Sequence, residues 1–487
     1  MTSVRLMTSL LTTVALGLTL TACTQTATSA PDTKNAAPAT IPGSFENGRQ
    51  ALTTRINARK EPRKAKNVIL FIGDGMGVST VTAMRIHAGQ KQGGAGEDYV
   101  LNMERFPHLA LSKTYNTDQQ VSDSAGTATA LMSGEKTRAG VLNIASSIKR
   151  GDCKTSLDNQ LPTLFEQAAE KGLATGIVST ARITHATPAA TYAKSPSRDW
   201  ERLKDLPEDA VAAGCQSIAV QMEASIKSGM LDVVLGGGTR EFEDSFKQNI
   251  SGTYISTATE LNAQGKTGAL PLVGLFSKSH MTYMAEKEAD NTEPTLTEMT
   301  QIAIDRLKNS DEGRAGGYIL MIESGRIDHG HHAGKAELAL EEGIEFDKAV
   351  KTAVDMVDPD NTLIIVTADH SHVFTIAGYP TRGNPILGTV IGNDDHGEPK
   401  STPVLAADGE PYTTLGYQNG PGAVDGVRNP DLSSGKVIRQ MAAIPGRSET
   451  HAGEDVPVFA KGPSSDLVSG VMEQNTIYHV MRHALDF

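Results

Sequence analysis

Residues 67–77 read Asn-Val-Ile-Leu-Phe-Ile-Gly-Asp-Gly-Met-Gly, a continuous apolar run that ends in an acidic, glycine-rich turn. A run that is apolar at consecutive positions is typical of a strand buried on both faces of a parallel sheet. The turn does not fit a dinucleotide loop, because its glycines lack the G-x-G-x-x-G spacing and the carboxylate of Asp74 would repel a pyrophosphate. We therefore expect Asp74 to bind a metal ion, with a helix N-cap as its other interpretation.

Similar apolar runs recur along the chain and alternate with helical patterns. This alternation predicts an α/β fold in which a doubly wound, mostly parallel sheet is flanked by helices. The expected strands are 67–72, 175–179, 231–235, 317–322, 362–367 and 456–461, and the expected helices are 161–171, 295–308, 336–357 and 475–485.

The composition is that of a folded, acidic globular protein. The chain has 487 residues, with 45 Lys and Arg against 57 Asp and Glu, for a net charge of −12. Its 39% hydrophobic content excludes disorder over the whole length, and the acidic balance argues against a nucleic-acid partner. Residues 380–447 are rich in Gly, Pro, Asp and Asn, which predicts a loop-rich insertion within a core formed by 47–379 and 448–487.

The first residues have the features of an export signal. Arg5 precedes an apolar stretch at 6–20 that is shorter than the roughly 20 residues a membrane span needs. Small residues then lead to Cys23, as in a bacterial lipobox, so we expect residues 1–22 to be removed and Cys23 to be lipidated. An ordinary cleaved signal with an incidental Cys is the alternative. Residues 23–46 are expected to form a flexible Thr/Ala/Pro tether, and the protein to be exported and lipid-anchored to the bacterial membrane, facing the periplasm or the cell surface.

The chain contains three cysteines, of which Cys153 and Cys215 lie in the exported body. An exported chain meets an oxidising compartment. There an even pair favours a disulfide over a redox or zinc site.

Polar clusters follow the expected strands, where open α/β sheets place their ligands. A small-residue segment predicts a helix that begins at Ser124, where free N–H groups stabilise an alkoxide or a phosphate, although many such serines are plain N-caps. Asp328 and His332 are four residues apart and share one face of a helical turn, as two ligands of one metal ion would. Burying such clusters without cations would cost several kcal/mol each. Two further polar clusters follow expected strands or precede them: Asp369-His370-Ser371-His372 and the run 449–454 around His451.

These motifs resemble those of the alkaline phosphatases, in the same order, from about Lys66 to the C-terminus. The matching runs are Asp123-Ser124-Ala125, the Asp328 and His332 pair, Thr367-Ala368-Asp369-His370 and Thr450-His451-Ala452-Gly453-Glu454-Asp455. The resemblance implies two zinc ions and one magnesium ion per subunit, with Ser124 as the nucleophile. It implies one zinc site at Asp328, His332 and His451, a second at Asp74, Asp369 and His370, and a magnesium site at Asp74, Thr187 and Glu323.

Further residues take roles from the same resemblance. Arg198 matches, by its spacing along the chain, the arginine that grips two phosphate oxygens. Asp123 and His372 are expected to support the ligands from behind. His185 and His329 stand where the best-known bacterial enzyme has Asp and Lys, and in this they resemble the animal enzymes.

Two larger features also resemble the animal enzymes. The insertion at 380–447, entered at Tyr379, is similar to their crown subdomain at the dimer interface, which implies a homodimer. The neighbourhoods of Cys153 and Cys215 resemble positions that are paired in those enzymes.

The implied activity is hydrolysis of small phosphate monoesters to alcohol and inorganic phosphate through a phosphoserine intermediate, favoured at alkaline pH. A sulfatase is disfavoured, because Ser124 is followed by Ala125-Gly126 and not by a Pro two residues on. A phosphodiesterase is the runner-up, but the fork of Arg198 suits two free phosphate oxygens. A non-catalytic phosphate- or metal-binding lipoprotein is the alternative from another class.

Overall fold

The computed structural model describes residues 44–57, 63–265, 267–424 and 438–487. The expected signal, Cys23 and the tether up to residue 43 lie outside these residues. Helix α1 begins at Phe45, so the last two residues assigned to the tether are helical. None of the described helices is both long enough and apolar enough to span a membrane.

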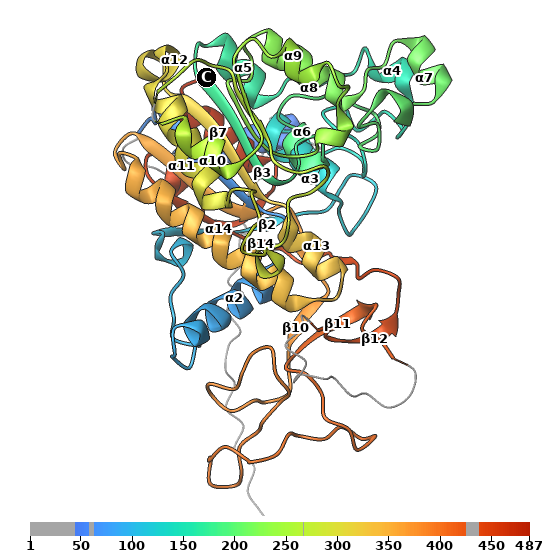
Figure 1. Cartoon of the computed structure of the whole chain (residues 1–487), viewed down its shortest axis with the longest axis vertical. Helices are drawn as coiled ribbons and strands as arrows, with labels where there is room; N and C mark the ends of the chain where they lie inside the picture. Colours follow the sequence, from blue (N-terminus) through green and yellow to red (C-terminus); the bar gives the residue numbers. More distant parts are fainter. Residues whose placement is uncertain (1–43, 58–62, 266, 425–437) are drawn as a thin grey trace, which may run out of the picture. The chain divides into compact units, whose positions relative to one another are not determined.

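A ten-stranded sheet forms the centre of the described chain (Figure 1). Its strands run parallel to their neighbours except β14, which is antiparallel to β2 and β8 on either side. The expected mostly parallel sheet is therefore confirmed. In spatial order the strands are β15 (Gly470–Glu473), β2 (His108–Lys113), β14 (Val456–Lys461), β8 (Thr362–Ala368), β1 (Asn67–Gly73), β7 (Tyr318–Ser324), β3 (Ala174–Arg182), β4 (Val233–Gly237), β6 (Leu272–Leu275) and β5 (Thr253–Ile255).

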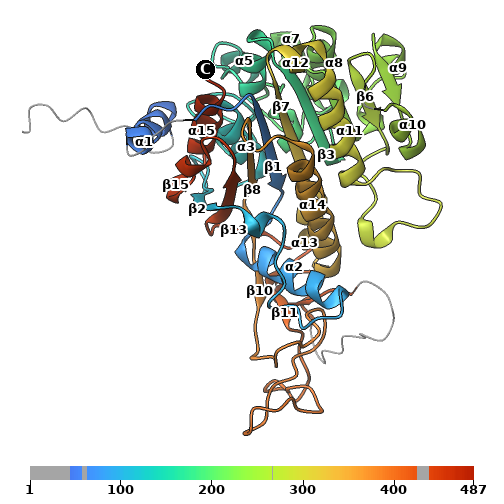
Figure 2. The same cartoon turned by 90° about the vertical axis from the view of Figure 1, so that its left-hand side faces the viewer.

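Helices cover both faces of this sheet (Figure 2), and the side chains of β1 explain why. Ile69 and Phe71 belong to the apolar core on one face, whereas Val68 and Leu70 belong to the core on the other. Because both faces of β1 are buried, its sequence is apolar from Val68 to Ile72 instead of alternating. The first face is covered by α2 (Val78–Lys91), α11 (Leu296–Asn309) and α14 (Ala336–Met356), and the second by α3 (Ser124–Ser133), α5 (Leu164–Glu170), α8 (Ile218–Lys227) and α15 (Thr476–Ala484).

Thr295 begins α11 with a capping box. Its side chain accepts a hydrogen bond from the backbone N–H of Glu298, and the Glu298 carboxylate accepts one from the backbone N–H of Thr295.

Shorter helices lie mostly in the connections between strands. The shorter helices are α4 (Cys153–Ser156), α6 (Ala186–Ala189), α7 (Glu208–Ala213), α9 (Phe246–Asn249), α10 (Ala258–Ala263), α12 (Asp311–Ala315) and α13 (Arg326–His332), in addition to α1 (Phe45–Asn57).

The expected insertion contributes two of the three strands of a second sheet, and the strand before it contributes the third. This sheet consists of β10 (Phe374–Ile376), β11 (Leu415–Gly420) and β12 (Met441–Pro445), with β11 in the middle. From 377 to 414 the chain forms turns and isolated bridges and no helix, as its Gly and Pro content predicts. Tyr379, at the entrance, has a positive φ of 55° and is 97% exposed.

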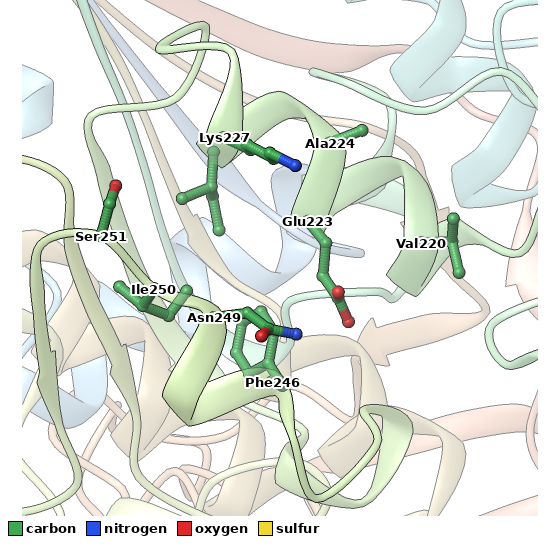
Figure 3. Close-up of a pocket in the computed structure, with 9 residues that line it drawn as sticks. Val220, Glu223, Ala224, Lys227, Phe246, Asn249, Ile250 and Ser251 are labelled. Carbon is green, nitrogen blue, oxygen red and sulfur yellow. The ribbon is translucent and has the colours of Figure 1, made fainter.

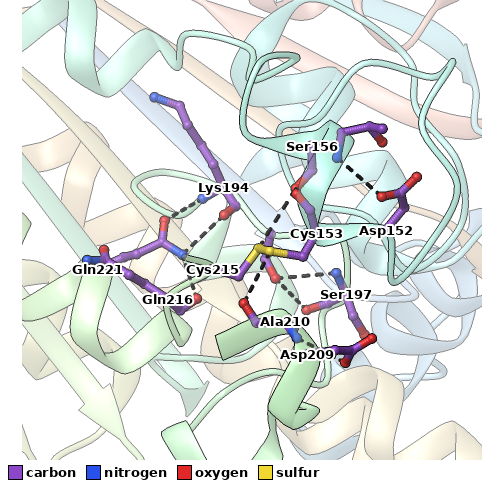
Figure 4. The surroundings of a disulfide bond; sticks show 12 residues. Asp152, Cys153, Ser156, Lys194, Ser197, Asp209, Ala210, Cys215, Gln216 and Gln221 are labelled. Carbon is purple, nitrogen blue, oxygen red and sulfur yellow. Dashed lines mark hydrogen bonds between the residues drawn. A yellow bond between two sulfur atoms is a disulfide. The ribbon is translucent and has the colours of Figure 1, made fainter. Parts of the chain in front are cut away.

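A disulfide joins Cys153 and Cys215, which confirms the expected pair (Figure 4). It links the first residue of α4 to the segment that follows α7. The bond packs with the buried side chains of Trp200 and Leu206 in a small apolar cluster separate from the two main cores.

Candidate active site

Three adjacent central strands deliver acidic residues to one edge of the sheet. The register pairs Gly73 of β1 with Ser324 of β7 and with Ala368 of β8, so the residues that follow these strands lie level with one another. Asp74 and Asp369 are the residues that follow β1 and β8, and both are fully buried. The carboxyl edge of a parallel sheet is where such folds place their ligands.

Asp74, Asp369 and His370 form the first cluster. Nε2 of His370 lies 3.4 Å from Oδ1 of Asp74 and 3.3 Å from Oδ2 of Asp369. The turn after β1 requires glycine at position 75, because its φ is +70° and a Cβ there would lie 2.3 Å from Nε2 of His372. Its backbone N–H donates to Oδ1 of Asp369 at 3.0 Å, which fixes that carboxylate.

Asp328, His332 and His451 form the second cluster. Asp328 and His332 lie on α13, and Oδ1 of Asp328 is 3.3 Å from Nε2 of both histidines. Each histidine points its Nδ1 at a backbone carbonyl, His332 at Glu449 and His451 at Ser122, both at 2.7 Å. The Nδ1 atoms therefore carry the protons, and the two Nε2 lone pairs face each other across 3.1 Å. Two facing lone pairs beside a carboxylate fit a cation between them.

Glu323 stands at the centre of a third group, with Asp74 and His185. Thr187 lies beside it, and the hydroxyl of Ser179 donates to its Oε2. Oε1 of Glu323, both Oδ atoms of Asp74 and Oγ1 of Thr187 are buried without a hydrogen-bond partner among the described residues. Buried polar atoms are normally satisfied, so this set of unpaired oxygen atoms fits a hard cation such as magnesium.

The pKa shifts of the buried carboxylates also indicate that cations bind at this site. Burial and the neighbouring charges of Asp369, Asp328 and Glu323 raise the pKa of Asp74 well above its usual range. Burial is also the main cause that raises the pKa of Glu323 to about 8. So many buried carboxylates repel one another, and bound cations remove that repulsion.

Ser124 is the first residue of α3, as expected, and it lies beside the first cluster. Its Oγ is 3.2 Å from Nε2 of His370. Asp123 is the N-cap of the helix, because its Oδ1 accepts from the backbone N–H of Gly126 at 3.2 Å. Ser124 is thus buried at a helix N-terminus, where the helix dipole favours negative charge.

Arg198 is brought to the same place by two hydrogen bonds. Its Nη1 donates to Oδ2 of Asp123 at 3.0 Å and its Nη2 donates to Nε2 of His185 at 3.1 Å. Although burial opposes it, Arg198 lowers the pKa of Asp123, together with the backbone N–H groups of Gly140 and Gly126. The guanidinium is held as a charged group in a fixed orientation beside Ser124.

His372 links the second cluster to a residue that the sequence analysis did not single out. Its Nε2 faces Oδ1 of Asp328 at 2.8 Å, and its Nδ1 faces Oε2 of Glu449 at 2.6 Å. Burial opposes protonation of this ring, but the two carboxylates raise the pKa of His372 to about 9. Glu449 lies two residues before His451, in a run already noted for its histidine, and that proximity was the available signal.

The structure thus brings the predicted metal ligands together with Ser124, Arg198, Asp123 and His372, and His329 lies beside His185 with their ring centroids 5.5 Å apart. A separate pocket of about 500 Å³ lies between α8 and α9 (Figure 3). Glu223, Lys227 and Phe246 are among the side chains that line it, and its lining includes none of the predicted site residues.

Comparison with known proteins identifies the same family. The alkaline phosphatase family profile matches residues 65–487. The chain is 42% identical to the tissue-nonspecific alkaline phosphatase of Gallus gallus over 455 residues, which cover 86% of this chain and 84% of that one. It is 40% identical to the corresponding Homo sapiens enzyme over 456 residues, covering 86% and 83%.

Solved structures share the fold. The alkaline phosphatase from the Antarctic bacterium TAB5 matches with a TM-score of 0.59 and 24% identity, covering 88% of this chain and 99% of that one. The Thermus thermophilus alkaline phosphatase matches with a TM-score of 0.61 and 22% identity, covering 92% and 96%. Family profile, sequence relatives and fold agree that the chain belongs to the alkaline phosphatase family and is a metal-dependent phosphomonoesterase.

Proposed function

We propose that Ser124 is the nucleophile in a double-displacement hydrolysis of phosphate monoesters. The observation that carries the proposal is the position of its Oγ, 3.2 Å from Nε2 of His370, at the start of α3 and beside Arg198. In the first half of the reaction Oγ bonds to phosphorus while the bond to the ester oxygen breaks, and the alcohol leaves. In the second half water adds to phosphorus, Oγ leaves, and inorganic phosphate is released.

Two zinc ions and one magnesium ion complete the proposed site. Asp328, His332 and His451 would hold one zinc, Asp74, Asp369 and His370 the other, and Asp74, Thr187 and Glu323 the magnesium. When bound, these ions supply positive charge that lowers the pKa of the serine hydroxyl and stabilises the leaving oxygen. The facing Nε2 lone pairs and the orphaned carboxylate oxygens support this assignment.

Arg198 binds the phosphoryl group in this proposal. Nη1 and Nη2 each use one N–H for Asp123 or His185, and each keeps a second N–H for a phosphate oxygen. Two parallel donors match a group with two free oxygens, as in a monoester. His372 and Glu449 act behind the ligands, because they orient Asp328 and do not face the reacting phosphorus.

Paired assays of a monoester and a diester test this function. The metal-loaded protein should hydrolyse p-nitrophenyl phosphate far faster than bis-p-nitrophenyl phosphate. A chelator should abolish the activity, and zinc with magnesium should restore it. Faster hydrolysis of the diester would instead favour a phosphodiesterase, and no hydrolysis of either ester would favour a binding protein.

We also propose that the chain forms a twofold dimer through the crown-like insertion, residues 380–447. Its resemblance to the animal crown and the exposure of Tyr379, an aromatic side chain that stands almost entirely in solvent, support this. Sedimentation should report a dimer for the parent protein and a weaker one for Tyr379→Ala. A fully active monomer at nanomolar concentration would contradict the proposal.

Export and lipid anchoring at Cys23 remain proposals that rest on the N-terminal sequence. Cells expressing the full chain and fed an alkyne-labelled fatty acid should yield labelled protein in the membrane fraction. Cys23→Ser should lose the label and leave the membrane fraction. Equal labelling of the two proteins would contradict lipidation at this residue.

A further inference from the structure

Three histidines meet beside the proposed magnesium site. His185 precedes α6, His280 follows β6, and His329 lies on α13. Their ring centroids are 5.2 Å apart for His185 and His280, 4.1 Å for His280 and His329, and 5.5 Å for His185 and His329. One nitrogen from each ring lies within 4.8 Å of the others, a spacing that by itself suits a metal ion.

The arginines around these rings argue against a cation there. Nη2 of Arg198 donates to His185 at 3.1 Å, and Nη1 of Arg326 donates to Nδ1 of His329 at 3.2 Å. The backbone N–H and the guanidinium of Arg182 both face His280. A cation among the rings would meet three guanidinium groups at close range, so the cluster suits an anion instead.

The three arginines differ in how their charges are balanced. Arg182 forms an ion pair with Glu201, and Arg198 forms one with Asp123 at 3.0 Å. Arg326 forms none within 4.0 Å with any carboxylate of the described residues. It is therefore the guanidinium in this group that no described carboxylate contacts directly, although its charge lowers the pKa of the nearby buried Glu342.

Arg326 is nonetheless held in place. Its Cζ lies 3.5 Å above the ring of Tyr283, a stacked cation–π contact. Its Nε is buried and lacks a hydrogen-bond partner among the described residues, while the side chain as a whole is half-buried. The buried Nε faces no solvent, but Nη2 makes no hydrogen bond with the described residues and is not among the buried atoms. An oriented guanidinium with such an accessible donor can bind a carboxylate or phosphate.

We propose that Arg326 binds a second anionic group carried by the substrate, and this rests on the function proposed above. A row of contacts runs from Arg198 through His185 and His329 to Arg326, so the two guanidiniums are separated by two imidazole rings. A phosphomonoester held by Arg198 would reach Arg326 with a phosphate or carboxylate a few bonds away on its alcohol part. The enzyme therefore prefers esters of anionic alcohols to esters of neutral ones.

Matched substrates test the preference. Propane-1,3-diol bisphosphate and 3-hydroxypropyl phosphate differ only in the second phosphate, and 4-phosphooxybutanoate carries a carboxylate instead. The measured quantity is the ratio of kcat/KM for each ester that carries a second anionic group to kcat/KM for 3-hydroxypropyl phosphate. The value for the bisphosphate is corrected for its two equivalent phosphates. We expect Arg326→Gln to lower this ratio by about tenfold or more, and Arg326→Lys to lower it less. The substrate whose kcat/KM ratio falls more in Arg326→Gln shows whether Arg326 prefers a phosphate or a carboxylate.

Arg240→Gln is the matched control, because Arg240 is a nearby arginine that is already paired with Glu241 at 2.7 Å. This variant should keep the kcat/KM ratio of the parent enzyme.

If Arg326→Gln fails to fold or to hold zinc, inhibition of the parent enzyme tests the inference instead. Propane-1,3-bisphosphonate should inhibit the parent at least tenfold more tightly than propylphosphonate. An unchanged ratio in a folded, zinc-loaded Arg326→Gln, or equal inhibition by the two phosphonates, overturns the inference. Absence of all monoester hydrolysis would contradict the proposed function instead.

Discussion

Oδ2 of Asp123 accepts a hydrogen bond from Nη1 of Arg198 at 3.0 Å, while its Oδ1 accepts from the backbone N–H of Gly126. One carboxylate therefore caps the helix that begins at Ser124 and orients the guanidinium proposed to bind phosphate. The proposed nucleophile and the proposed phosphate ligand therefore share Asp123 as a support, although Arg198 is also held by His185.

Replacing Asp123 should thus weaken phosphate binding more than it weakens metal binding. In Asp123→Ala we expect inorganic phosphate to inhibit about tenfold more weakly, because Arg198 loses its partner, and the fold to lose about 1 kcal/mol with the helix cap. Asp118→Ala is the control. Asp118 accepts a hydrogen bond from the backbone N–H of Ala139 at 2.9 Å and forms no hydrogen bond with Arg198. An unchanged inhibition constant for phosphate would show that Arg198 does not depend on Asp123.

Ser124→Ala should remove the covalent intermediate and leave the zinc content unchanged. Rapid quenching with labelled phosphomonoester should trap phosphoprotein in the parent and in Ser133→Ala, which alters a buried serine at the other end of α3. Slow residual hydrolysis is compatible with the proposal, because Arg198 and the metals still stabilise the transition state. Phosphoprotein in Ser124→Ala would exclude this residue as the nucleophile.

Magnesium should bind more tightly as the pH rises towards 8. In the metal-free protein burial raises the pKa of Glu323 from 4.5 to about 8, so below that pH a proton must leave before the carboxylate can bind the ion. Each pH unit below about 8 should cost roughly tenfold in magnesium affinity. Titration calorimetry of magnesium into the metal-free protein in two buffers would measure affinity and released protons together.

Glu323→Gln is the test of this pH dependence. It should bind magnesium weakly and with a shallower pH profile, since the amide cannot ionise whereas Asp74, whose pKa is also raised, still does. The metal-free parent should also lose stability as the pH rises from about 4.5 to about 8, because the folded state holds this proton more tightly than the unfolded state does. A parent affinity that does not change between pH 6 and pH 8 would contradict the prediction.

His185→Asp should tighten magnesium retention. His185 lies with Asp74 and Glu323, and an added anionic oxygen there suits magnesium better than an imidazole does. The shorter carboxylate also remains an acceptor type that Arg198 can bind. We expect slower loss of magnesium during dialysis and less competition by zinc, whereas His280→Asp should change neither. Equal magnesium loss by His185→Asp and the parent would remove His185 from this site.

The disulfide should contribute mainly to stability. Its cysteines are 62 residues apart, and in the chain-entropy model closing a loop of that length contributes about 4 kcal/mol. The double variant Cys153→Ser, Cys215→Ser should therefore unfold at lower denaturant concentration with its kcat little changed, because the bond lies in a separate apolar cluster. Equal unfolding midpoints under oxidising and reducing conditions would refute this.

The strands that carry the site could be predicted from sequence because they are buried on both faces. The run before Asp74 and the run before Asp369 are mostly apolar and are buried at every position, and the predicted strands end within one residue of the observed ones. Strand β2 was not predicted, because Leu109 and Leu111 are exposed and the burial pattern alternates. The reversed direction of β14 depends on non-local pairing, which a local apolar pattern does not encode.

Individual site residues were predictable where polar groups recur at a fixed spacing, as in Asp328 and His332. Glu449 and Arg326 were not, because a single carboxylate or guanidinium in a polar run looks like a solvated side chain until its partners are known. Glu449 is recognised by its contact with His372, and Arg326 by its stacking on Tyr283 and by the absence of a carboxylate of the described residues in direct contact with it. Such information lies in the folded structure and not in the local sequence.

The two-residue pairing of His451 in β13 (His451–Ala452) with His372 in β9 (Ser371–His372) has a consequence for biosynthesis. During vectorial synthesis, residues that precede the insertion emerge from the ribosome first, and the ligand supplied by His451 emerges only in the last tenth of the chain. A nascent or truncated polypeptide thus lacks one of the three proposed ligands of its zinc site. A polypeptide that stops before His451 should therefore bind zinc more weakly at this proposed site, although it keeps Asp328 and His332.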